Sequence, residues 1–228
     1  APLGWWPDEP GILAGRDLRA GGTWLGLSRT GRFGLVTNFR DANGAAAADA
    51  PSRGQLVPRF LGGTASVSAD LAALRPEAAR YAGFNLLLGD RGELFYFTNA
   101  DDAAPRCLPP GIYGLSNHRL DEPWPKLVRT RERFVAALAA VAPDPAELAD
   151  ILADRTPAAL DPPPDAGLPA DLERALSAPF VLHERYGTRC STLVLVGHEG
   201  RTVVQEWRFD STGRQRGAGR FEFMETAG

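Results

Sequence analysis

The chain has 228 residues, of which 44% are hydrophobic, and its formal net charge at pH 7 is −3. This length and hydrophobic content can fill a sizeable core, and we expect one domain over residues 1–228. The charge balance argues against a basic surface for nucleic acid, and no apolar run is long enough to span a bilayer. We therefore expect a cytoplasmic protein. Its richness in Ala, Arg, Gly and Pro is typical of high-GC bacterial coding.

The most regular pattern lies between Gly15 and Arg40, after an extended lead-in and a short predicted strand at 11–15. Side chains alternate over 23–28, turn residues follow at 29–32, and alternation resumes over 33–38, which predicts a β-hairpin. Each arm of this hairpin contains a glycine in its interior. Glycine weakens a strand, so its presence there suggests close approach by another backbone, a bulge or a ligand. The second arm ends in polar residues, which suits either a site on a rigid scaffold or a capped strand end.

The rest of the chain mixes strands and helices. We expect strands at 84–89, 93–99, 111–117, 180–183, 192–196 and 202–208. We expect helices at 68–74, 76–81, 125–141, 145–152 and 170–177. A surface loop is expected at 41–52, and prolines make 156–169 an excursion on the surface. Hairpins separated by helices favour an α+β fold of two stacked, mostly antiparallel sheets with helices outside.

Several short motifs, in this order along the chain, resemble those of the NRDE family, which includes transport and Golgi organisation protein 2. They are GRDLRAGGTWLG from Gly15, TNFR from Thr37, RGQL from Arg53, GFNLL from Gly83, GLSN from Gly114, WPK from Trp124 and YGTRCST from Tyr186. Members of that family open with Met-Cys, a strand and Asn-Arg-Asp-Glu, whereas this sequence starts at Ala1, just beyond that point. We therefore expect the natural protein to carry an upstream strand with an N-terminal cysteine. Such a strand would cover an otherwise exposed sheet edge.

The resemblance implies a four-layer αββα sandwich of the N-terminal nucleophile hydrolase type. In that class an N-terminal residue attacks an amide, and asparagine and backbone N–H groups hold the oxyanion. By similarity to the choloylglycine hydrolase branch, Asn38 and Asn117 match the two asparagines of the site. The other interpretation of both residues is that they form turns at strand ends. The alternative function implied by the family is non-catalytic binding of haem or acyl lipids, whereas the hydrolase needs no cofactor.

If there is a cleft, Asn85 is expected to join Asn38 and Asn117 in it, together with the Arg16 and Asp17 pair. The apolar walls are then expected to come from three aromatic side chains: Trp24, Phe39 and Trp124. Arg189 precedes a predicted buried strand, so its guanidinium needs an acidic partner such as Asp17 or an anionic ligand. For haem, the axial ligand is expected to be His118.

Metal and cysteine chemistry are not indicated. The three histidines lack metal-ligand spacing, so we expect no metal site. Cys107 and Cys190 are far apart in the sequence, and we expect two buried thiols.

Overall fold

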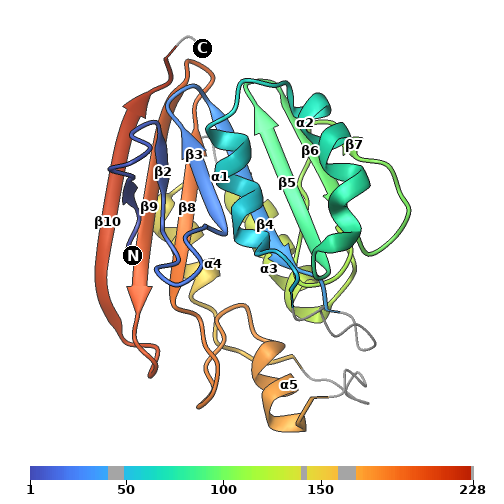
Figure 1. Ribbon diagram of the computed structural model, residues 1–228. Coiled ribbons are helices and arrows are strands. Elements are labelled where there is room, and N and C mark those ends of the chain that lie inside the picture. The colour runs from blue at the N-terminus through green and yellow to red at the C-terminus, as the bar shows by residue number, and fades with distance from the viewer. Residues whose placement is uncertain (41–48, 140–142, 159–167, 227–228) are drawn as a thin grey trace.

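The computed structural model describes residues 1–40, 49–139, 143–158 and 168–226 (Figure 1). They form an α+β sandwich of two antiparallel sheets, with seven and three strands. The first sheet holds β1 (Gly4–Trp5), β2 (Ile12–Ala14), β3 (Leu25–Ser28), β4 (Arg32–Asn38), β5 (Phe84–Asp90), β6 (Glu93–Thr98) and β7 (Arg106–Cys107), in that order. The second holds β8 (Cys190–Val196), β9 (Arg201–Phe209) and β10 (Gln215–Met224), with β9 in the middle.

Helices cover the outer faces of the two sheets. The described helices are α1 (Leu56–Leu61), α2 (Val67–Leu74), α3 (Pro125–Leu138), α4 (Pro145–Leu152) and α5 (Ala170–Leu176), with 3-10 turns at Arg53–Gln55 and Arg75–Arg80. Figure 1 shows α1 and α2 on one face of the seven-stranded sheet and α4 behind β8. The two-residue period of a strand explains the layers, because Leu193 and Leu195 pack with α4 residues whereas Val194 points to the other sheet. The layer order is helix, sheet, sheet, helix.

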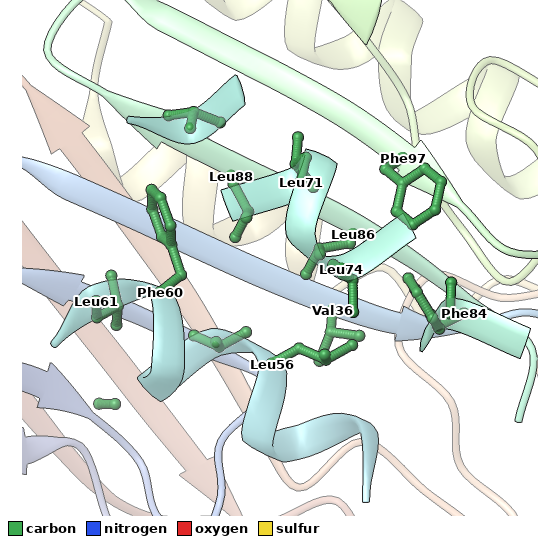
Figure 2. Packing of buried hydrophobic residues seen from close by; sticks show 14 of the residues in the cluster. Val36, Leu56, Phe60, Leu61, Leu71, Leu74, Phe84, Leu86, Leu88 and Phe97 are labelled. Carbon is green, nitrogen blue, oxygen red and sulfur yellow. The ribbon is translucent and has the colours of Figure 1, made fainter. Parts of the chain in front are cut away.

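The main core lies between α1, α2 and the seven-stranded sheet. Figure 2 shows Phe60 and Leu71 from the helices facing Val36, Leu86 and Phe97 from the strands. Phe60 and Leu86 are at most 1% exposed. Burial of this kind contributes about 1.5–3 kcal/mol per large apolar side chain, which makes this face the rigid base of the molecule.

The predicted hairpin is confirmed, and the two interior glycines face each other in it as β3 and β4 pair. A Cβ on Gly26 would lie 2.8 Å from Leu61 Cδ1, and one on Gly34 would lie 3.0 Å from Val57 Cγ1. Both contacts come from α1. The close approach expected at these glycines is therefore that of helix side chains, and neither a bulge nor a ligand is needed to explain them.

Two predicted strands are wrong. Residues 111–117 are a loop, because Gly114 exchanges hydrogen bonds with Asp121, donating to Oδ1 and accepting from the backbone N–H at 2.8 Å each. Residues 180–183 make a single bridge, Leu182 with Gly187, because the Val181 N–H is taken by the Thr188 hydroxyl.

The unpredicted elements include one helix and one long strand, besides the two-residue strands β1 and β7. Helix α1 contains Pro58 near its start, where a missing N–H costs little, and the last strand, β10, alternates in burial along its whole length. Three expectations fall partly outside the described residues: the loop at 41–52, the end of the helix at 125–141 and the Pro-rich excursion at 156–169. The thiols were also misjudged, since Cys107 is exposed on the edge strand β7 and Cys190 is half-buried.

Candidate functional site

The end of β4 and the loop 115–118 lie side by side, although they are about 80 residues apart in sequence. The Thr37 hydroxyl donates to Ser116 O at 2.9 Å, and the Asn117 side-chain amide donates to Asn38 O at 3.1 Å. The Arg40 N–H in turn donates to Asn117 O at 2.6 Å. Three hydrogen bonds thus hold the two sequence-predicted asparagines, Asn38 and Asn117, at one end of the sheet.

Asn85 lies beneath this junction and is fully buried. Its amide donates to Thr37 Oγ1 at 3.2 Å and to His118 O at 2.9 Å, and its Oδ1 accepts from the Tyr96 hydroxyl at 2.8 Å. Burial raises the pKa of Tyr96, which keeps the phenol protonated as a donor. Asn85 therefore supports the loop from below, and it does not line the cavity to which a ligand has access.

A cavity of about 450 Å³ opens above the two asparagines. It is lined by Asn38, Phe39, Arg40, Arg53, Asn117, Leu168, Leu172, Leu176, Arg185 and Tyr186. We call it the Asn38 cavity. Its walls come from the end of β4, the loop 115–118, the 3-10 turn that begins at Arg53, helix α5 and the loop after α5. Three arginines and no carboxylate line it, so the described part of its wall is cationic.

A smaller cavity of about 200 Å³ adjoins it and shares Arg40 and Leu176 with it. Trp124, Lys126 and Glu173 line this second space. The Lys126 ammonium donates to Leu176 O, the carbonyl of the last residue of α5, at 2.9 Å. Burial, and to a lesser degree the Arg40 guanidinium, lower the pKa of Lys126 to about 8. Lys126 is the only lysine in the chain.

An aromatic stack stands next to both cavities. The His118 ring lies 4.8 Å from Phe39 and 6.2 Å from Trp124, centroid to centroid. Its Nδ1 is 3.3 Å from the carboxylate of Glu122. Of the three predicted wall residues, Phe39 and Trp124 therefore lie together, with His118 between them.

Four of the sequence-predicted site residues lie elsewhere. Arg16 pairs with Asp8 at 2.6 Å and stacks over Trp6, while Asp17 accepts backbone N–H bonds in its own turn. Trp24 is 43% exposed and contacts Cys190. Arg189 is exposed, and no ion pair joins it to Asp17 in the described part of the chain. None of the four lines the Asn38 cavity or its neighbour.

Sequence reasoning missed the basic residues of the site, and it predicted helix α5 without placing it at the site. Arg40, Arg53 and Lys126 stand inside the motifs TNFR, RGQL and WPK, from which only Asn38, Phe39 and Trp124 were predicted to belong to the site. The single lysine among 25 Lys and Arg residues was a usable signal, because a lysine changes its charge on burial and an arginine does not. Nothing in the local pattern placed Arg185 at the same cavity as Asn38.

Among the described residues, no helix is long and apolar enough to cross a membrane. In the same part of the chain, no group of three or more His, Cys, Asp or Glu side chains could hold a metal ion.

These features define a class of protein: an α+β sandwich of two antiparallel sheets with a polar cavity at the end of a central strand. A family model described as "Transport and Golgi organisation 2" matches residues 1–211. The mouse "Transport and Golgi organization 2 homolog" is 32% identical over 217 residues, which cover 88% of this chain and 78% of the relative. The cow and human homologues are also 32% identical, over 223 and 217 residues, with the same coverage.

The chain therefore belongs to the Transport and Golgi organisation 2 family, and the NRDE resemblance is confirmed. These relatives are mammalian, so they give no support to the bacterial source expected from composition.

Proposed function

We propose that the Asn38 cavity binds a small molecule and that the protein hydrolyses an amide bond in it, using a cysteine from a segment upstream of Ala1. The observation that carries this proposal is the pairing of Asn38 with Asn117 on one cavity, at the end of a rigid sheet. The Asn117 amide uses one N–H on Asn38 O and retains a second. An oxyanion needs such donors within about 3 Å.

The outer edge of β8, in the three-stranded sheet, has room to pair with an additional strand. Within the described residues β8 pairs with β9 alone, so its other edge has unpaired backbone groups beside half-buried apolar side chains. An open space of about 830 Å³ adjoins the end of β8, with Leu27, Phe33 and Val196 in its lining. A strand added to β8 would cover both the edge and this space, and proteins rarely leave such edges open.

The alternative is a carrier without chemistry, for haem or an acyl lipid. Leu172 and Leu176 in the cavity wall offer apolar surface to either ligand. For haem the expected ligand is His118, but its ring is stacked between two aromatic side chains and its Nδ1 faces Glu122. Haem iron would have to reach the other ring nitrogen.

The deciding experiment restores a Met-Cys strand before Ala1 and tests the protein on a panel of N-acyl amides, beside titrations with haem and with an acyl lipid. Amide turnover that is lost when the added cysteine is replaced by alanine supports the hydrolase. Absence of turnover, together with tight haem binding lost in His118→Ala, would establish a haem carrier instead. Tight acyl-lipid binding without turnover would establish the lipid carrier.

A further inference from the structure

Four basic side chains gather around the two adjoining cavities: Arg40, Arg53, Lys126 and Arg185. Glu173 is the one carboxylate among the described lining residues of either cavity, and it lies in the smaller one. The protein as a whole carries a net charge of −3, so this concentration of positive charge is local. A concave wall of one sign of charge attracts and holds ligands of the opposite sign.

The guanidinium groups differ in how they are held. Arg53 is half-buried and donates to Gly83 O at 2.8 Å, and burial lowers its pKa. Arg40 lies 5.5 Å from the Trp124 ring centroid and lines both cavities. In the described part of the chain no ion pair engages Arg40, Arg53 or Arg185, whereas Arg16 and Arg129 each have one. Arg40 and Arg53 are half-buried and Arg185 is exposed, so desolvation concerns the first two, for which a bound anion would offset the cost.

The same cavity also has apolar lining. Leu172 and Leu176 come from α5, and Phe39 and Tyr186 add aromatic surface next to Arg40 and Arg185 in the chain. One cavity thus offers both positive charge and hydrocarbon contact. Recognition of a charged head beside an apolar body needs both surfaces.

We infer that the ligand of this site is an amphiphile with one anionic group, a carboxylate or a phosphate, held by Arg40 together with Arg53 and Arg185. Its apolar part lies against Leu172 and Leu176. This inference rests on the proposed site and narrows its ligand class. For an amide substrate it specifies an N-acyl compound that retains a free anionic group.

Three probes separate charge from shape in a calorimetric titration of the chain: N-decanoylglycine, its neutral analogue N-decanoylglycinamide, and decyl phosphate. We expect at least one of the two anions to bind about tenfold or more tightly than the neutral amide, as charged hydrogen bonds to a guanidinium require. Arg40→Gln should remove that preference, and the exposed Arg19→Gln should retain it. The tighter of the two anions identifies the head group as carboxylate or phosphate.

The single lysine gives a second readout. An amine-reactive acylating reagent can modify one side-chain amine, at Lys126, which peptide mass spectrometry separates from the N-terminal amine. An anion held at Arg40 should slow acylation of Lys126 severalfold, and the neutral amide should not.

The outcomes are distinguishable. If the neutral amide binds as tightly as both anions, or Arg40→Gln leaves the preference intact, the anion inference is overturned. Slower acylation of Lys126 by whichever probe binds then shows whether the cavity is still the ligand site. If none of the three probes binds, the inference and the proposed site both fall. Thermal melts check that each variant folds. If Arg40→Gln does not fold, Arg185→Gln is the decisive variant in its place.

Discussion

Strand β4 has an arginine at its start and another just beyond its end, and the two have different environments. Arg32 is 5% exposed, donates to Gly63 O and Ala65 O at 2.7 and 2.8 Å, and lies 3.9 Å over the Phe60 ring. Arg40 lines two cavities and has no ion pair in the described part of the chain. An arginine surrounded by backbone carbonyls, such as Arg32, is structural. An arginine that lines a cavity, such as Arg40, is available to a ligand.

The largest effect is expected from Arg32→Met. Loss of the guanidinium leaves the two carbonyls without their donor and removes a cation from the face of the Phe60 ring. We therefore expect the substitution to destabilise the fold by about 3 kcal/mol. Urea unfolding measures this change in unfolding free energy. The control is Arg19→Met at an exposed position, which should change it by less than about 0.5 kcal/mol. Equal stability of the two variants would mean that Arg32 is not structural.

Gly26→Val tests the close packing of the hairpin against helix α1. Its Cβ would approach Leu61 Cδ1 at 2.8 Å and Ala14 Cβ at 3.1 Å, so overpacking should cost about 2 kcal/mol. The matched control is Gly4→Val, another strand glycine, because nothing lies within 4 Å of its Cβ position. A similar midpoint in urea for both variants would contradict the close approach of α1.

Lys126→Met tests the buried charge beside the smaller cavity. The folded pKa of about 8 lies below the ordinary 10.5, so above pH 8 the unfolded chain binds a proton that the folded chain does not. Wild-type stability therefore gains from this group as pH rises from 8 to 10.5, and below pH 8 the full cost of the buried charge is present.

The variant lacks this group, so its stability relative to the wild type should be greatest near pH 7. That advantage should shrink by roughly 1–3 kcal/mol by pH 10. Unfolding free energies at pH 7, 8.5 and 10 test this. A difference that does not change with pH would show that the amine titrates normally.

The smallest effect on stability is expected from Arg40→Gln. Its side chain faces a cavity, so the change in unfolding free energy should stay within about 1 kcal/mol. A loss of unfolding free energy as large as that of Arg32→Met would mean that Arg40 is a structural residue, like Arg32.

The parts of the fold that follow from local pattern were predictable. The hairpin of β3 and β4 follows from alternation, and helices α2 and α4 were predicted at 68–74 and 145–152. Helix α2 begins one residue earlier than predicted, because its cap is Ser66. Loop 111–117 imitates a strand in sequence, but side-chain and backbone bonds to Asp121 hold it as a loop.

The site was only half predictable, because its halves meet through tertiary contacts. Asn38 and Asn117 were identified from motifs, but the role of Asn85 depends on Tyr96 and His118, which lie on other segments. Arg16 and Asp17 are adjacent in sequence and were expected to act together. Each instead bonds to a different neighbour, since Asp8 lies within reach of the guanidinium.

Hydrogen exchange with mass spectrometry tests most directly whether the Asn38 cavity is the ligand site. With saturating N-decanoylglycine or decyl phosphate, we predict slower exchange in peptides covering 37–40, 115–118 and 170–177, and no change in peptides from β9 and β10. Protection confined to the turns at 89–93 and 196–200, which line the larger open space between the sheets, would contradict the account.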